Sequence, residues 1–143
     1  DKLVDVGVLQ TAHCVFHCGE LESTDHLFFQ CSFSANVWLD VLRLCNISRP
    51  ILPWANEVLW MSAHAKGNQF HHRIRKLAFA ATVYHIWLER NRRCFNNRFL
   101  PPQEIVLKVR MEVSGKLTTA NNAQKDDRHH GLCINWGIPI PSD

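Results

Sequence analysis

Residues 13–33 read HCVFHCGELESTDHLFFQCSF and bring three cysteines and three histidines into one short stretch. Zinc prefers four tetrahedral ligands, which proteins supply as thiolate sulfur and imidazole nitrogen. A short lobe buries little apolar surface by itself, and a bound metal can supply the missing folding free energy. The cluster therefore predicts a small lobe built around Zn²⁺ near the start of the chain.

Spacing identifies three of the four zinc ligands and leaves two candidates for the fourth. His26 and Cys31 form an H-x4-C pair, and the apolar residues between them can pack beneath a metal. Cys14 completes the other pair either with Cys18, as C-x3-C, or with His17, as C-x2-H. A thiolate binds zinc more strongly than an imidazole and brings negative charge to a dication. The chemistry alone therefore favours Cys14, Cys18, His26 and Cys31, with His17 as the alternative to Cys18.

The residues after the cluster show the apolar spacing of helices. Ser34 can cap the first of them. Pro50 and Pro53 interrupt the pattern, and residues 54–65 predict a short second helix. The apolar stripe of the first helix consists of Val37, Trp38, Val41, Leu42 and Cys45.

The longest helix is expected over residues 70–97, where Tyr84 and Trp87 should pack in the core. Pro101-Pro102 ends this helix and opens another, because proline suits a first helical turn. The broad apolar face of the long helix comprises Leu77, Ala80, Ala81, Val83, Tyr84, Trp87, Leu88, Cys94 and Phe95. The helix after it repeats an apolar residue every fourth position, at Ile105, Val109, Val113 and Leu117.

These patterns predict a mainly α-helical fold with a zinc-binding lobe at residues 1–48. Residues 49–69 are expected to be a linker with one short helix, and residues 70–118 a helical region that contains the long helix. Residues 119–143 begin with the polar run TANNAQKDDRHHG and end in an apolar segment rich in proline. We expect them to form a flexible, disordered tail.

Composition says more about the cellular compartment of the protein than about its binding partner. The 143 residues carry a net charge of +3, which is too mild to identify a ligand. Six cysteines are few for a disulfide scaffold, and no secretory signal or membrane-spanning apolar run is evident. We therefore expect an intracellular protein, nuclear or cytoplasmic, that is neither secreted nor membrane-bound. In such compartments clustered cysteine and histidine indicate a metal, whereas the isolated Cys45, Cys94 and Cys133 are expected to be ordinary thiols.

Two long motifs carry a resemblance to one family. The first is CVFHCGELESTDHLFFQCSFSANVWLDVL at residues 14–42, and the second is RKLAFAATVYHIWLERNRRCFNN at residues 75–97. They resemble the zinc-binding region that follows the reverse transcriptase in plant non-LTR retrotransposons of the long interspersed element type. The lead DKLVDVGV also resembles the stretch before the family's first cysteine, so the similarity covers most of residues 1–117.

The resemblance implies a non-catalytic zinc-binding module, truncated at its N-terminus, whose partner would be the upstream reverse transcriptase segment of a polyprotein. The family's second cysteine falls at position 17, where this chain has His17, so the resemblance and the chemistry favour different fourth ligands. No Tyr-x-Asp-Asp polymerase motif occurs in the sequence, and we expect neither enzymatic activity nor a small-molecule substrate. A zinc-activated water with Glu20 or Glu22 as its base is disfavoured, because four sulfur-rich ligands leave no open position.

Basic residues near both ends of the long helix make RNA or DNA the expected partner. Lysine and arginine bind phosphates with an affinity that falls as salt rises. The same side chains could instead stay solvated at the helix ends. The alternative function is a zinc-stabilised structural or protein-interaction scaffold with no nucleic-acid role. The candidate contacts to nucleic acid are Arg73, Arg75, Lys76, Arg90, Arg92, Arg93 and Arg98.

Overall fold

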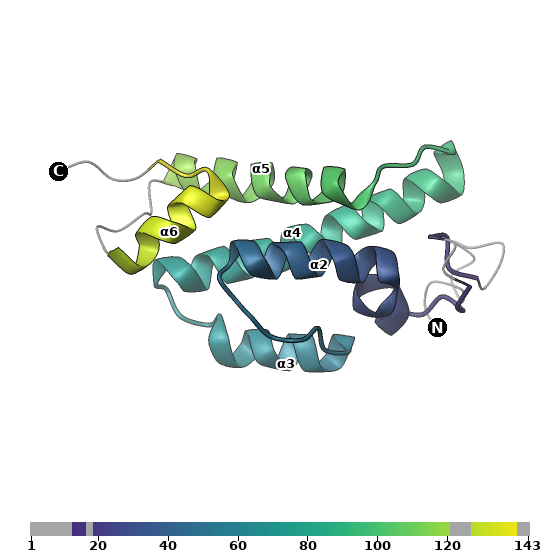
Figure 1. Ribbon diagram of the computed structural model, residues 1–143, viewed down its shortest axis with the longest axis horizontal. Coiled ribbons are helices and arrows are strands. Elements are labelled where there is room, and N and C mark those ends of the chain that lie inside the picture. Colours follow the sequence, from purple (N-terminus) through teal and green to yellow (C-terminus); the bar gives the residue numbers. More distant parts are fainter. Residues whose placement is uncertain (1–12, 17–18, 121–126, 140–143) are drawn as a thin grey trace.

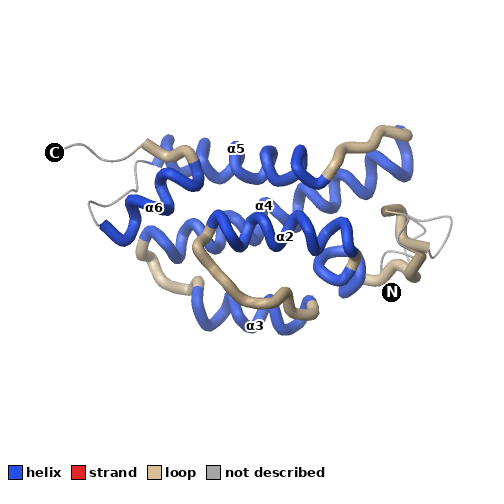
Figure 2. The backbone as a smooth tube through the Cα atoms, viewed as in Figure 1, coloured by secondary structure: helices blue, strands red, loops and turns tan. Residues whose placement is uncertain are grey.

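The computed structural model describes residues 13–16, 19–120 and 127–139. Within these ranges the chain is helical, with no strand and one isolated antiparallel bridge between His13 and Leu21 (Figures 1 and 2). The expected mainly α fold, with the Cys/His cluster ahead of the helices, is confirmed. The helices are η1 (His26–Gln30), α2 (Ser32–Leu44), α3 (Trp54–His64), α4 (Phe70–Asn91), η2 (Arg92–Asn96), α5 (Pro102–Ala120) and α6 (Asp127–Trp136).

Helices α4 and α5 form an antiparallel pair, and α2 packs against both of them (Figure 1). Helix α3 flanks α4, and α6 closes one end of the bundle against α2, α4 and α5. The loop that carries the first cysteine lies at the opposite end (Figure 1). One cluster of buried side chains runs through the molecule from Cys14 to Ile138. None of the helices in the described part of the chain is long and apolar enough to span a bilayer.

Helix α2 buries the whole stripe that the sequence predicted, from Val37 to Cys45. Burial also raises the pKa of the Cys45 thiol to about 12, so this side chain stays protonated at neutral pH. The predicted cap is wrong, because the helix begins at Ser32. The hydroxyl of Ser34 instead donates to the Cys31 carbonyl at 3.2 Å, inside the first turn.

Asparagine ends both α2 and the long helix by adopting a left-handed backbone conformation. Asn46 has a φ of 59°, and the Ile47 N–H donates to the Leu42 carbonyl at 2.9 Å, as in a Schellman motif. Asn97 has a φ of 53° and follows η2, which continues α4 without a break. The helical segment therefore covers residues 70–96, with its last turn π-helical, and ends one residue before the predicted bound at 97.

The face of α4 that points into the core differs from the predicted one. Of the expected apolar face, only Ala81 is fully buried, although Leu77, Val83 and Trp87 are partly buried against the core. Tyr84 is 52% exposed, so its expected place in the core is wrong. The buried face includes polar groups that satisfy one another or the backbone, and a pattern of apolar residues cannot reveal it. The Thr82 hydroxyl, for instance, donates to the Ala78 carbonyl at 2.7 Å. The buried residues of α4 are Phe70, Ile74, Ala78, Ala81, Thr82, Ile86, Glu89 and Arg90.

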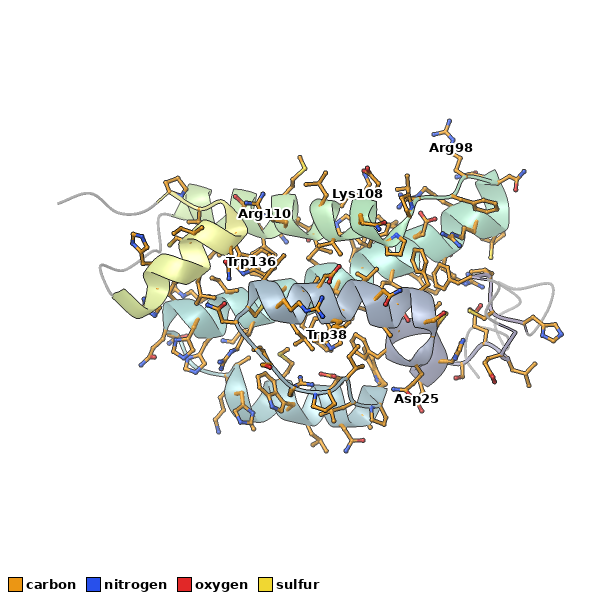
Figure 3. All side chains as sticks on the ribbon, in the orientation of Figure 1. Asp25, Trp38, Arg98, Lys108, Arg110 and Trp136 are labelled. Carbon is orange, nitrogen blue, oxygen red and sulfur yellow. The ribbon has the colours of Figure 1, made fainter. Side chains whose placement is uncertain are left out.

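The C-terminal region corrects a second expectation. Residues 127–139 are not a flexible tail, because α6 buries Leu132, Cys133 and Trp136 against the bundle. Figure 3 shows Trp136 pointing from α6 into the interior. Gly137, with a φ of 66°, ends the helix, and the Ile138 N–H donates to the Cys133 carbonyl at 2.9 Å. The other part of the expected tail, residues 121–126 and 140–143, lies outside the described residues, as does the lead at residues 1–12.

A buried carboxylate fastens the linker before α3. Glu57 is fully buried and accepts two hydrogen bonds from the Arg49 guanidinium, at 2.7 and 3.0 Å. It accepts a third from the Leu52 N–H at 2.8 Å. The Arg49 guanidinium also stacks 4.4 Å above the Trp60 ring. The linker is therefore held to α3 by one side chain with several partners.

Glu57→Gln is expected to destabilise the fold by about 3 kcal/mol, because Arg49 loses its anion in a partly desolvated site. The free energy of unfolding in urea measures the loss. Asp40→Asn is the matched control, since the Asp40–Arg43 pair is exposed and should contribute less than about 1 kcal/mol. Equal losses in the two variants would show that burial adds nothing to the Glu57 contacts.

Candidate metal centre

A tight turn positions the first cysteine. The Cys14 N–H donates to the Glu20 carbonyl at 2.9 Å, and the His13–Leu21 bridge closes the turn behind it. Gly19 has a φ of 91°, which a residue without Cβ adopts at little cost. The local sequence therefore folds Cys14 back toward the start of η1.

The second pair of ligands is positioned by a π-helical turn. The Cys31 N–H donates to the His26 carbonyl at 2.7 Å, and this i+5 bond explains why an H-x4-C spacing brings the two residues together. The Ser23 hydroxyl accepts a hydrogen bond from the His26 N–H at 3.0 Å and so caps this segment. Asp25, which directly precedes η1, makes no side-chain capping bond.

The three residues meet in a geometry that suits a metal ion. Ligand atoms of Cys14, His26 and Cys31 all lie within 4.8 Å of one another. The two sulfur atoms are 3.7 Å apart, far beyond the roughly 2.05 Å of a disulfide bond. Two thiolates that each bind a tetrahedral zinc at about 2.3 Å lie about 3.8 Å apart. The observed donors and their spacing therefore fit zinc, although other metals also accept thiolate and imidazole ligands.

The identity of the fourth ligand, His17 or Cys18, remains a prediction from the sequence. His17 and Cys18 lie outside the described residues, so the choice between them stays a prediction. Both follow Cys14 within four positions of the sequence, which is the usual gap for a zinc-binding pair.

The three residues that follow His26 pack into the main core. Leu27, Phe28 and Phe29 are all buried. The Phe29 ring lies 5.1 Å from Trp38 and 5.6 Å from Trp54, so η1 packs on both α2 and α3. Trp38 points from α2 into the space toward α3 in Figure 3. The candidate metal site is therefore built on the end of the main core.

An arginine joins the turn to the far end of the long helix. The Arg93 guanidinium lies 4.9 Å from the centre of Phe16, 4.5 Å from Phe33 and 5.1 Å from Phe99. Phe16 and Phe33 stack on each other with centroids 4.4 Å apart. Such cation–π contacts stabilise most when they are desolvated. Arg93 thus helps to hold the turn that carries Cys14.

A buried ion pair joins the metal loop to α4. The Arg90 Nε donates to Glu22 Oε1 at 3.1 Å, and both side chains are 0% exposed. Burial raises the pKa of the Glu22 carboxyl, while the Arg90 charge opposes that rise. Arg90 is therefore removed from the set of candidate nucleic-acid contacts, because it cannot reach a phosphate. Glu22 is likewise committed to Arg90 and is not placed to act as a general base.

A second buried carboxylate engages two more of the candidate arginines. Glu89 accepts hydrogen bonds from Arg92 Nε at 3.0 Å, from Arg93 Nε at 2.7 Å and from the Leu100 N–H at 2.8 Å. These contacts fix η2 and the loop before α5. Arg92 and Arg93 therefore serve the fold, and the single charge of Glu89 compensates one of their two positive charges.

The remaining basic residues lie at two separate places. Arg75 donates to the His64 carbonyl and Lys76 to the Gly67 carbonyl, at 2.6 and 2.9 Å, near the start of α4, where Arg73 is half-buried. Arg98 follows the other end of the helix and points away from the bundle in Figure 3. From Lys76 to the end of α4 the axis covers about 22 Å, so these residues do not form one patch.

One of these ion pairs had a local signal in the sequence and the other had none. Glu89 precedes Arg92 and Arg93 by three and four positions, the spacing at which side chains meet on a helix. Glu22 and Arg90 are 68 positions apart, and only the tertiary fold brings them together.

Comparison with family models, with curated proteins and with solved structures finds no match to this chain. The class of this protein is therefore described by its fold and its candidate site. It is a helical bundle that carries, at one end, a Cys/His group able to hold a metal ion.

Proposed function

We propose that this protein is a non-catalytic zinc-binding module in which the metal fastens the N-terminal loop to the helical bundle. The supporting observation is the convergence of Cys14, His26 and Cys31, whose ligand atoms lie within 4.8 Å of one another. The side chains of Cys14 and Cys31 are buried, which suits a structural zinc site. The motifs in residues 14–42 and 75–97 further support a place in a retrotransposon-type reverse transcriptase polyprotein.

Metal analysis of the purified chain tests the zinc proposal. We expect stoichiometric zinc in the wild type and its loss in Cys14→Ser. Comparing Cys18→Ser with His17→Ala identifies the fourth ligand, because only the true ligand lowers the affinity when it is removed. The absorption spectrum of the Co²⁺-substituted protein counts the bound thiolates independently. A wild-type chain that binds neither Zn²⁺ nor Co²⁺ under reducing conditions would refute the proposal.

A scaffold role is better supported than nucleic-acid binding. Arg90, Arg92 and Arg93 are engaged by buried carboxylates, so much of the expected basic surface is committed to the fold. The four remaining candidates, Arg73, Arg75, Lys76 and Arg98, would release few counterions. We therefore propose that the zinc-stabilised bundle acts as a structural and protein-interaction scaffold, with RNA or DNA binding as the second candidate.

Titration of labelled single-stranded RNA and DNA with the zinc-loaded protein at several salt concentrations separates the two roles. With four contacts, log K should fall with log salt at a slope no steeper than about −3. We expect weak binding that disappears at physiological salt. Tight binding that is lost in Arg73→Ala and Arg98→Ala would overturn the scaffold proposal and establish the nucleic-acid role.

A further inference from the structure

The outer side of α3 and α4 carries an apolar groove. One hollow of about 520 Å³ is lined by Phe28, Phe79, Ala80, Val83, Tyr84 and Trp87. A second, of about 320 Å³, is lined by Phe79 together with Val58, Met61, Ala65, Lys66 and Lys76, among others. Phe79 lines both hollows, and the two together are called the α3/α4 groove below. Along α4 it extends from Lys76 to Trp87, or about 16 Å of helix axis.

Helix α3 contains many apolar residues but buries few of their side chains. All of its residues are described, and the one fully buried side chain is Glu57. Val58, which lines the second hollow, is 38% exposed, and Tyr84, which lines the first, is 52% exposed. Contiguous apolar surface of this kind marks an interaction site more often than single exposed residues do. The groove therefore has the character of an interface with one side missing.

Charge around the groove defines what the partner must carry. Residues 54–91 contain two carboxylates, Glu57 and Glu89, and both are fully buried in ion pairs. Lys66 and Lys76 are exposed at one end of the groove. In the described part of α3 and α4 these cations therefore face no exposed carboxylate. A partner is expected to supply negative charge at that end and apolar side chains along the rest.

The shape and the charge together favour a helix over a nucleic acid. A polynucleotide needs cations spaced along its whole backbone, whereas the lysines of the groove are confined to one end. Most of the groove wall is hydrocarbon and aromatic ring, which suits side chains repeated at i, i+4 and i+7. Its length matches about three turns of helix.

We propose that the α3/α4 groove docks an amphipathic helix of a partner protein, with an apolar stripe over Phe79, Val83 and Trp87 and carboxylates over Lys66 and Lys76. This inference deepens the scaffold role proposed above and rests on it. Phe28 lines the groove and lies between His26 and Cys31, so helix binding is measured on zinc-loaded protein, and the metal content of the same sample is determined alongside it.

The probes are two fluorescein-labelled peptides of about 18 residues, long enough to form a helix. Both carry leucine and tryptophan at i, i+4, i+7 and i+11, and they differ only in having three Glu or three Lys at one end. Fluorescence anisotropy with the zinc-loaded full chain is expected to show that the Glu peptide binds at least about tenfold more tightly than the Lys peptide. Lys66→Glu combined with Lys76→Glu should reverse this preference.

Ala80→Glu tests the apolar wall without a risk to the core, since Ala80 is exposed on α4. It should weaken the Glu peptide at least about tenfold, because a charge then faces the apolar stripe. Leu107→Glu on α5 is the matched control, because it places the same charge on an exposed leucine outside the groove. Unchanged circular dichroism in both variants shows that the fold is retained.

Four results would overturn the proposal. Equal affinity for the two peptides would show that the lysines do not select the partner's charge. Undiminished binding of the Glu peptide to Ala80→Glu would show that the peptide does not bind in the groove. Self-association that Ala80→Glu abolishes would assign the groove to a second copy of the chain. Single-stranded RNA that competes with the Glu peptide at equal concentration would assign it to nucleic acid. Loss of peptide binding with full zinc content refutes the docking inference alone, whereas absence of zinc refutes the metal proposal.

Discussion

Cys31→Ser is expected to release the bound zinc and to unfold the N-terminal turn together with η1. Cys31 is fully buried where η1 meets α2, and its sulfur lies 3.7 Å from that of Cys14. Serine keeps the size and the backbone hydrogen bonds of the residue but offers no thiolate. Structural zinc contributes about 10–16 kcal/mol of apparent binding free energy in small domains, which exceeds the net stability of many folds.

Metal content and thermal unfolding followed by circular dichroism measure this effect. Cys94→Ser is the matched control, because Cys94 is half-buried and lies outside the metal cluster, so this variant should keep the zinc and nearly the wild-type melting temperature. A chelator should reproduce the Cys31→Ser result in the wild type and change the variant little. If Cys31→Ser kept both its zinc and its stability, Cys31 would not be a ligand.

Arg90→Met is expected to cost about 3–5 kcal/mol of folding free energy, because it leaves the buried Glu22 carboxylate without its cation. Methionine retains most of the aliphatic bulk of arginine, so the loss reports mainly on charge. For a fold of this size the cost corresponds to a fall in melting temperature of roughly 10–15 °C. Equilibrium unfolding in urea gives the free energy directly.

The loss of unfolding free energy in Arg90→Met, relative to the wild type, should also depend on pH. Burial already raises the pKa of Glu22 in the folded state, and removal of the Arg90 charge raises that pKa further. A carboxyl with a raised folded pKa favours the fold below its unfolded pKa of about 4.3, and that stability is lost as pH rises through the folded pKa. The gap between variant and wild type is therefore expected to widen from about pH 5 to pH 8.

A double variant shows whether the loss comes from the stranded carboxylate. Glu22→Gln combined with Arg90→Met removes both charges and should be more stable at neutral pH than Arg90→Met alone. The double variant should also lose most of the pH dependence. If the two variants were equally unstable at every pH, the contribution of Arg90 would lie in its packing against Trp87, whose ring centre is 5.2 Å from the guanidinium.

The sequence by itself determined most of the helices and the candidate metal ligands that lie close together along the chain. Apolar residues at helical spacing gave α2, α3, α5 and the length of the long helix, because these patterns are local. Cys14, His26 and Cys31 were likewise found from spacing, since short-range hydrogen bonds of a tight turn and a π-turn shape the segments that carry them. The C-terminal helix had local signals too, namely Leu132, Cys133 and Trp136 followed by Gly137, but the nearby prolines outweighed them in the prediction.

Only the tertiary structure decided which face of α4 is buried and what its arginines do. The apolar pattern predicted that the side of α4 with Tyr84 and Trp87 is buried. In the structure the fully buried side is the one with Glu89 and Arg90. Charged groups can be buried when each meets a partner, and the partner of Arg90 is Glu22 in the N-terminal loop. A pairing across 68 positions leaves no periodic trace in the chain. Three of the arginines that the sequence assigned to nucleic acid therefore belong to the fold, and the apolar side of α4 is only partly buried, with Tyr84 exposed.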